Sequence, residues 1–211
     1  MKLYYSPGAC SLAPHIVMAE LNMAYELEAV NTQTKMTANG DNFLNINKKG
    51  AIPALKMDNN EILTEGAIIS QYLCDSMEAP TTMCPKFGTL DRVRVNEWMN
   101  FIATDIHKSF SPLFGVKFGT YTNDTTKNDI TEFATKNLTN KMTFVSEKLG
   151  NNDFLTGKNF TIADAYLFTC LNWAKVVGFD YSNFTNINNF MNKVSERPAV
   201  MKAMKEEGLL K

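Results

Sequence analysis

The chain has 211 residues, of which 45% are hydrophobic and 20% charged, enough for one large domain or two small ones with real cores. The net charge of −1 and the lack of any Lys or Arg run argue against binding to nucleic acid or to an anionic membrane. No apolar run approaches the ~20 residues of a membrane-spanning helix. The first residues, MKLYYSPGAC, lack the apolar core of a signal peptide, so we expect a cytoplasmic protein.

The cysteines are Cys10, Cys74, Cys84 and Cys170, and they form no CxxC pair and no spacing with histidine that suits zinc. We therefore expect separate thiols in a reducing compartment, with no disulfide framework and no metal site. Only Cys10 has a local context that suggests chemistry.

The first third of the chain alternates between short strands and helices. The predicted elements are a strand at residues 2–5, a helix at 10–22, a strand at 25–30, a polar loop at 32–40, a short helix near 42–46 and a hairpin at 54–57 and 61–63. Thr64 stands where the next helix should begin, with Glu65 in its first turn. The predicted order is β-α-β-α-β-β-α, with an early helical crossover and a final antiparallel pair.

The rest of the chain is predicted to be helical. Residues 78–87 lie in a stretch with two prolines and no apolar period, and we interpret them as a linker between a domain at 1–77 and a domain at 88–211. The predicted helices cover residues 90–107, 129–149, 160–177, 187–194 and 198–207. Thr161 and Asp164 form a predicted capping box, and the polar residues 120–129 are interpreted as a mobile segment near a pocket mouth.

Cys10 follows a Pro-Gly turn and opens the first predicted helix. At a helix N-terminus the dipole and the unpaired amides favour the thiolate, so we expect the pKa of Cys10 to lie below its ordinary value of about 8.5. The alternative is that Cys10 packs as a small apolar residue, as most cysteines do. The hydroxyl of Ser11 either reaches a ligand sulfur or only caps the helix.

Two features near the hairpin go beyond ordinary structure. Ile52-Pro53 precedes a strand, where proline removes a ladder donor and where a cis bond would turn the chain sharply. Glu65 and Gly66 place backbone amides at a helix N-terminus, which is a suitable place for a ligand carboxylate.

Asn100, Thr104, His107 and Lys108 share i, i+4, i+7 and i+8 spacing, which places them on one polar helix face. This face is either a solvated surface or one wall of a cleft. The cleft is favoured because a His-Lys pair closes a stripe of uncharged hydrogen-bonding side chains, and histidine acts as acid or base near neutral pH. Lys35, in the loop after the second strand, is either a partner for a ligand carboxylate or a solvated lysine.

Together these segments resemble a cytosolic glutathione S-transferase of the bacterial beta class over essentially the full length. The resemblance rests on LYYSPGACSLAPHI, NKKGAIPAL, LTEGAIISQYL, NFIATDIHKSFSPLF and FTIADAYLF. It implies a thioredoxin-like α/β N-terminal domain, an all-α C-terminal domain that contributes the electrophile pocket, and a homodimer. It also implies glutathione as co-substrate, a small hydrophobic electrophile as second substrate, and a role in detoxification.

The resemblance further implies roles for single residues, with Cys10 and His107 as catalytic candidates. The implied glutathione-binding residues are Cys10, Lys35, Ile52, Pro53, Glu65, Gly66, Asn100, Thr104, His107 and Lys108, with a cis bond before Pro53. The class usually has Ser or Gly at the position of Gly66, which keeps the backbone donor but lacks a hydroxyl. Thr104 stands where serine is common.

Three functions follow as hypotheses. The leading one is transfer of the glutathione thiolate to small hydrophobic electrophiles. The second is glutathione-dependent thiol–disulfide exchange or peroxide reduction with Cys10 as nucleophile, and a Cys10→Ser variant separates the two. The third is a protein of the same fold that only binds ligands or partner proteins, because one fold hosts many functions.

Overall fold

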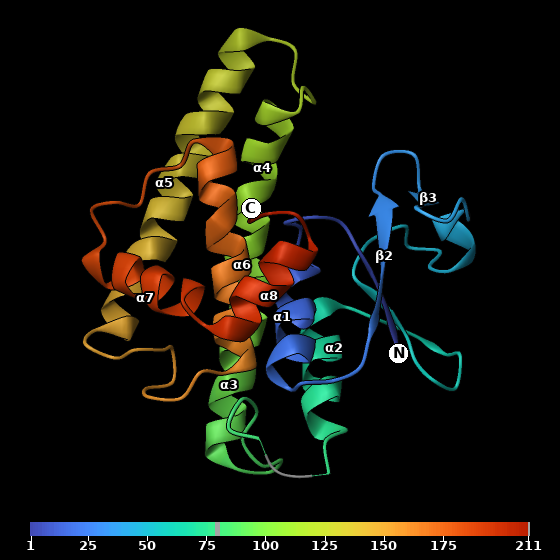
Figure 1. The fold of residues 1–211 in the computed structure, drawn as a ribbon. Coiled ribbons are helices and arrows are strands. Elements are labelled where there is room, and N and C mark those ends of the chain that lie inside the picture. Colours follow the sequence, from blue (N-terminus) through green and yellow to red (C-terminus); the bar gives the residue numbers. More distant parts are fainter. Residues whose placement is uncertain (79–80, 211) are drawn as a thin grey trace.

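The structure is a computed structural model that describes residues 1–78 and 81–210; residues 79 and 80, within the predicted linker, and residue 211 lie outside the described residues. In chain order (Figure 1) the elements are β1 (Lys2–Tyr5), α1 (Leu12–Glu20), β2 (Glu26–Asn31), β3 (Met36–Thr37), the 3-10 turn η1 (Phe43–Asn45), β4 (Ala54–Lys56), β5 (Ile62–Thr64), α2 (Gly66–Asp75), α3 (Leu90–Phe101), the π-helical turn η2 (Ile102–Ile106), α4 (His107–Lys117), α5 (Asp124–Leu149), α6 (Ile162–Val177), α7 (Thr185–Ser195) and α8 (Pro198–Glu206).

The strands form one mixed sheet in the order β3-β2-β1-β4-β5. β1 and β2 are parallel and joined by α1, whereas β4 runs antiparallel to both β1 and β5. This confirms the predicted thioredoxin-like arrangement. The structure adds β3, which pairs with the end of β2 inside the predicted polar loop. Two residues are too few to show a strand period in the sequence.

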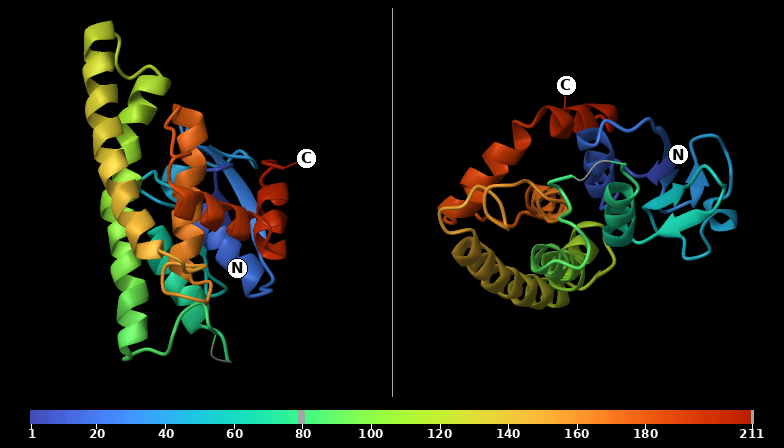
Figure 2. Two further views of the ribbon diagram at one scale, coloured as in Figure 1. Left: turned by 90° about the vertical axis from the view of Figure 1, so that its left-hand side faces the viewer. Right: turned by 90° about the horizontal axis from the view of Figure 1, so that it is seen from below.

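α1 and α2 lie between the sheet and the larger group of helices (Figures 1 and 2). Neighbouring side chains of β1 point to opposite faces: Leu3 joins the core formed with the helices, whereas Tyr4 packs with Phe43 of η1 on the other face. The larger core runs without a break from Leu3 through Ile16 of α1 to Phe168 of α6. The sheet and the helical part are therefore fixed against each other.

Several predicted helix ends move in the structure. Thr64 is the last residue of β5 and pairs with Ala54, so the prediction that it begins the helix is wrong; Glu65 is the residue before α2. Residues 124–129, predicted to be part of a mobile segment, form the first turns of α5, where the Asn123 side chain accepts a hydrogen bond from the Thr126 amide at 3.0 Å.

The predicted helix at 90–107 continues through η2 into α4, which the sequence did not reveal. The π-turn shifts the helical period there, and Pro112 lies inside α4. The predicted capping box is confirmed: the Asp164 carboxylate accepts hydrogen bonds from the amide and hydroxyl of Thr161, both at 2.8 Å. Within residues 1–78 and 81–210, no helix combines the length and apolarity that crossing a membrane requires.

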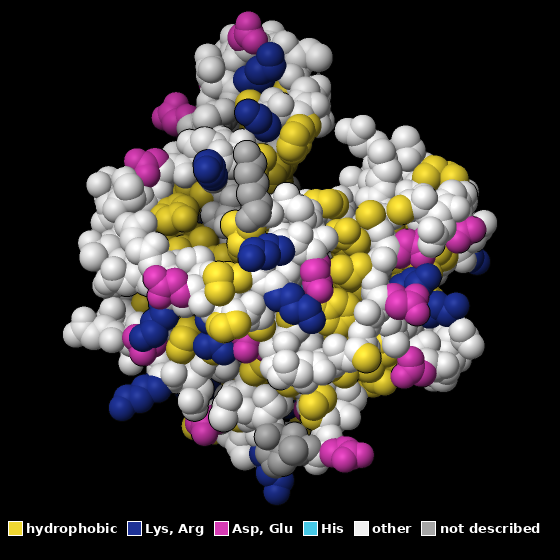
Figure 3. Space-filling view, viewed as in Figure 1, with side chains coloured by type: hydrophobic (Ala, Val, Ile, Leu, Met, Phe, Trp, Pro, Cys, Tyr) yellow, Lys and Arg dark blue, Asp and Glu magenta, His cyan; other side chains and the backbone are white. Residues whose placement is uncertain are grey.

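On the face drawn in Figure 3, a notch separates the projecting ends of α4 and α5 from the region of β2 and β3, and hydrophobic side chains line it.

Candidate active site

A cavity of about 290 Å³ lies where the turn after β1, the loop before β4, the start of α2 and the junction of η2 with α4 meet. Its lining residues are Cys10, Asn47, Lys49, Ala51, Ile52, Pro53, Thr64, Glu65, Gly66, Ala103, His107, Lys108 and Tyr166. Seven of the ten predicted site residues are in this set. These segments are far apart in the sequence, and the common core holds them together.

One wall of the cavity is built by close contact of three backbone segments. The Ile52-Pro53 bond is cis, as the resemblance implied. The Cys10 thiol donates a hydrogen bond to the Ile52 carbonyl at 3.3 Å. A Cβ on Gly66 would lie 3.4 Å from Cγ of Pro53 and 3.9 Å from the Cys10 carbonyl oxygen, so the start of α2 packs in van der Waals contact with both segments. The Cys10 turn, the proline loop and the helix start therefore form one unit.

The electrostatics of Cys10 differ from the prediction. Burial raises the pKa of Cys10 to about 11, although the amides of Cys10 and Ser11 and the charge of Lys108 act in the opposite direction. The expected lowering of the pKa is therefore wrong: α1 begins at Leu12, and the favourable amides are outweighed by desolvation. The Ser11 hydroxyl is buried and bonded to the backbone of Ser6, so it does not face a ligand.

The Glu65 end of the cavity is charged and open to solvent. The Glu65 carboxylate pairs with Lys49 at 2.5 Å, and Lys49 also donates to the Thr64 hydroxyl at 3.0 Å. Glu65 has φ of 71°, a left-handed conformation that costs a non-glycine residue about 1 kcal/mol or more and tends to occur at functional sites. The Glu65 side chain at the N-cap position does not cap α2, so the first amides of the helix are available to an anion.

The other end of the lining is aromatic and more buried. His107 Nδ1 lies 2.7 Å from the Tyr166 hydroxyl, and the His107 ring packs edge-on against Trp173 with centroids 4.7 Å apart. Burial, and then the neighbouring charge of Lys108, lower the pKa of His107 to about 4. The imidazole is therefore neutral at physiological pH. Burial also raises the pKa of Tyr166, which keeps its hydroxyl protonated and able to donate.

Within the part of the chain that the structure describes, three of the ten predicted site residues do not line the cavity. Lys35 donates to the Gly50 carbonyl at 2.8 Å and is not among the residues that line the cavity. Thr104 faces a smaller hollow between α4 and α5, and its hydroxyl bonds to Asp105 at 2.9 Å. Asn100 is exposed, away from the cavity. Of the predicted polar face, only His107 and Lys108 reach the cavity.

Sequence reasoning missed four polar residues of the lining: Asn47, Lys49, Thr64 and Tyr166. Asn47 shapes the loop by donating to the Ala51 carbonyl at 2.7 Å. Lys49 lies in the segment NKKGAIPAL, and its place in the loop before Ile52-Pro53 could have indicated a positively charged site residue. Tyr166 gave no signal, because an aromatic residue in an apolar helix ordinarily indicates core.

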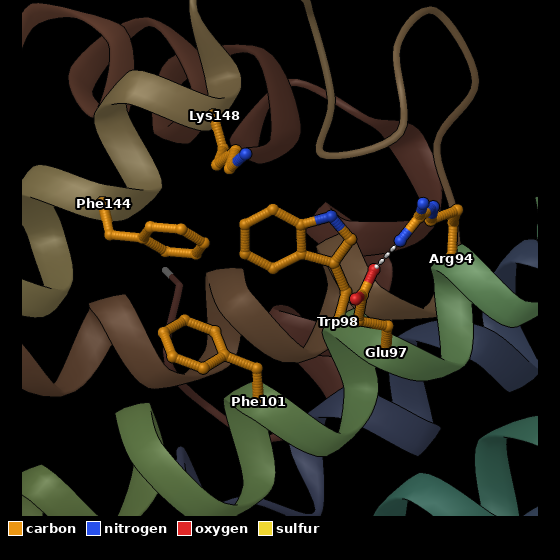
Figure 4. Close-up of a pocket in the computed structure, with 6 residues that line it drawn as sticks. All are labelled: Arg94, Glu97, Trp98, Phe101, Phe144 and Lys148. Atoms are coloured by element: carbon orange, nitrogen blue, oxygen red, sulfur yellow. Dashed lines mark hydrogen bonds and ion pairs between the residues drawn. The ribbon is translucent and has the colours of Figure 1, made fainter.

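A second hollow, of about 490 Å³, lies between α3 and α5 (Figure 4). Trp98, Phe101 and Phe144 surround it with their rings, and Arg94 pairs with Glu97 at its rim at 2.8 Å. It contains no thiol, imidazole or hydroxyl among its described lining residues. Of these two hollows, the 290 Å³ cavity is therefore the one that contains the side chains a nucleophilic site requires.

Comparison with known proteins gives a consistent result. The family model for the glutathione S-transferase N-terminal domain matches residues 1–75, and the model for the C-terminal domain matches residues 109–198. Glutathione S-transferase GstA of Escherichia coli O157:H7 is 40% identical over 209 residues, covering 99% of this chain and 100% of that protein.

Two solved structures extend this likeness to the backbone. A beta-class glutathione S-transferase of Sphingomonas chungbukensis is 35% identical with a TM-score of 0.91, and 100% of each chain is covered. A sphingomonad glutathione S-transferase complexed with glutathione is 35% identical with a TM-score of 0.89, again over 100% of each chain. The chain therefore belongs to the glutathione S-transferase family, in its bacterial beta class.

Proposed function

We propose that glutathione occupies the 290 Å³ cavity and that its thiolate attacks small hydrophobic electrophiles. The observation that carries the proposal is the polarity of the cavity, charged and open at Glu65 but aromatic and more buried at His107 and Tyr166. The ammonium and carboxylate of the γ-glutamyl end are matched by the Glu65 carboxylate and the first amides of α2. The thiol end then lies beside Cys10, against the cis-proline loop.

Activation of glutathione requires that its thiolate is stabilised more than its thiol. Cys10 keeps its own proton, so it acts as a neutral hydrogen-bonding neighbour of the glutathione sulfur. The Tyr166–His107 pair has two polar protons, of which one forms the bond between the two side chains and the other can donate to the sulfur, and Lys108 supplies positive charge. The thiol proton leaves to solvent, the sulfur forms a bond to the electrophilic carbon, and a leaving group departs with its electron pair.

The electrophile has an aromatic route to this sulfur. Trp173 touches His107 and packs against Phe114 at 5.5 Å between ring centroids, and Phe114 stacks on Phe118 at 6.0 Å. Phe118 is 67% exposed. Phe114 and Phe118 lie toward the C-terminal end of α4, which is the end that projects in Figure 1. This aromatic surface favours apolar electrophiles as a class.

Thiol–disulfide exchange remains the second candidate, but the raised pKa of Cys10 weighs against it, since the thiolate is the nucleophile in such exchange. A Cys10→Ser variant distinguishes the two: conjugation survives under the proposal, whereas exchange would vanish under the alternative. All four cysteines are free thiols, which supports a reducing, cytoplasmic location.

We also propose that two copies associate through α2 and α3. Both helices expose large apolar side chains that a single copy leaves uncovered: Ile68 (49%) and Tyr72 (39%) on α2, and Leu90 (67%) and Val93 (55%) on α3. Arg92 joins the two helices through Asp75 at 2.7 Å, which keeps this surface in one piece. Light scattering should give a dimer for the native chain and a monomer for Val93→Glu.

The direct test of function is calorimetric titration of the reduced protein with glutathione, followed by turnover of an activated aryl halide. Saturable binding with conjugation, retained in Cys10→Ser, is the expected result. No binding at millimolar glutathione would contradict both enzymatic functions and favour a protein that only binds other ligands or partners.

A further inference from the structure

The turn that carries Cys10 is held from the far end of the chain. Gly8 has φ of 69°, and its amide donates to Oε2 of Glu207 at 2.8 Å. Its carbonyl accepts a hydrogen bond from Nε1 of Trp173 at 2.7 Å. Both polar groups of Gly8, two residues from Cys10, are therefore fixed by side chains of the helical part.

Glu207 is itself held in place. Its side chain is fully buried, and Oε1 lies 2.9 Å from Nδ1 of His15, which is also fully buried. The other ring nitrogen of His15 faces Oε2 of Glu206 at 2.8 Å, and the Tyr25 hydroxyl donates to the same oxygen at 2.7 Å. A buried carboxylate is costly unless it is hydrogen-bonded on both oxygens, and Glu207 meets that condition through Gly8 and His15.

α8 is anchored to α1 at both of its ends. Arg197, just before α8, makes a two-point pair with Glu20 at the end of α1, at 2.6 and 2.8 Å. Glu206 and Glu207, at the other end of α8, hold His15 in the middle of α1. Of these two glutamates, Glu207 also hydrogen-bonds to the turn before α1, through the Gly8 amide.

We propose that Glu207 is a positioning residue for the active site: its carboxylate fixes the Gly8 amide, and through it the turn that presents Cys10 to the cavity. The proposal rests on the proposed glutathione site and extends it to the C-terminal helix. Neither Glu207 nor His15 lines the cavity, so the effect on the reaction is indirect.

Glu206 provides a matched control, because it is adjacent to Glu207, binds the same histidine and does not touch Gly8. Glu207→Gln removes the negative charge, so that at most a neutral amide oxygen accepts from the Gly8 amide. Loss of a charge-assisted hydrogen bond at a buried site should raise the population of the opened turn roughly tenfold. Glu206→Gln leaves the Gly8 contact intact.

The experiment measures the rate at which iodoacetamide alkylates Cys10, followed by mass spectrometry of the Cys10 peptide, in the full chain without glutathione. Glu207→Gln should alkylate roughly tenfold faster than the native protein, and Glu206→Gln at the native rate. In turnover, Glu207→Gln should lower kcat with little change in KM for glutathione, since the binding groups are untouched. Equal alkylation rates in both variants, or no change in Glu207→Gln, would overturn the proposal.

A measurement on the native protein covers the case in which Glu207→Gln does not fold. The Gly8 amide should exchange with solvent deuterium much more slowly than an exposed turn amide, because it is bonded to a buried carboxylate. Exchange at the unprotected rate would contradict the proposal. Neither this readout nor the alkylation rate requires glutathione, so failure of the positioning role is distinct from failure of the proposed function.

Discussion

The two ends of the cavity solve opposite problems. At one end the Glu65 and Lys49 side chains are 64% and 57% exposed, so both charged groups keep most of their hydration. At the other end Cys10, His107 and Tyr166 lie where burial keeps all three neutral at physiological pH. Under the proposed function, recognition of a charged ligand and control of a thiol fall to different side chains of one cavity, although the charge of Glu65 still contributes to the raised pKa of Cys10 and of Tyr166. Four changes test that division.

The largest expected effect concerns the protonation of Cys10. A rise of its pKa from the ordinary value to about 11 lowers the thiolate fraction at least about 100-fold at neutral pH. The thiolate is the charged form, so burial disfavours it and its absorbance at 240 nm should appear only as the pH approaches 11. Cys10→Ser supplies the baseline. A transition centred near pH 8 would show that Cys10 is not held neutral by burial.

The next effect concerns Glu65. Glu65→Gln removes the charge that would pair with a ligand ammonium, at a cost of roughly 1.5–3 kcal/mol, and should weaken glutathione binding by about 10- to 100-fold. Glu61→Gln is the control, because Glu61 lies on the same hairpin and, among the described residues, its carboxylate accepts a side-chain hydrogen bond only from Asn59. Calorimetry measures both. Equal losses in the two variants would contradict a specific role for Glu65.

A smaller effect is expected at the aromatic end. His107→Phe and Tyr166→Phe each break the 2.7 Å bond between the two side chains, and each should lower kcat about tenfold with little change in glutathione affinity. If the two residues act as a pair, the double variant is no slower than either single one. Fully additive losses in steady-state kinetics would show that they act independently.

The smallest effect is on stability at the charged end. Lys49→Ala breaks an exposed ion pair, so the free energy of unfolding should change by less than about 1 kcal/mol. Tyr166→Phe, which leaves His107 without its partner in a buried place, should cost about 1–3 kcal/mol. Urea unfolding measures both. A larger loss for Lys49→Ala than for Tyr166→Phe would reverse the comparison.

The same division decides how much the sequence could predict. The charged end is built from segments that are close in the sequence. The hairpin, the Ile52-Pro53 segment and Glu65-Gly66 lie within about 15 residues, so the sequence pattern alone predicted them. Even there Thr64 was misplaced, because a threonine before an apolar helical pattern suits an N-cap and a strand end equally.

The aromatic end depends on contacts that sequence spacing does not show. His107 meets Tyr166 across 59 residues, and Gly8 meets Glu207 across 199. The predicted direction of the Cys10 pKa shift was wrong for the same reason. The sequence shows the nearby helix amides, which lower this pKa, but not the burial that outweighs them. The π-turn η2 displaced Asn100 and Thr104 from the face that regular helical spacing predicted.

The separation of the two ends is tested most directly by titrating glutathione into the native protein, Glu65→Gln and His107→Phe by calorimetry under identical conditions. The account predicts saturable binding to the native protein, binding weakened about 10- to 100-fold in Glu65→Gln, and affinity within about threefold of native in His107→Phe. Lost binding in His107→Phe with native affinity in Glu65→Gln would contradict it.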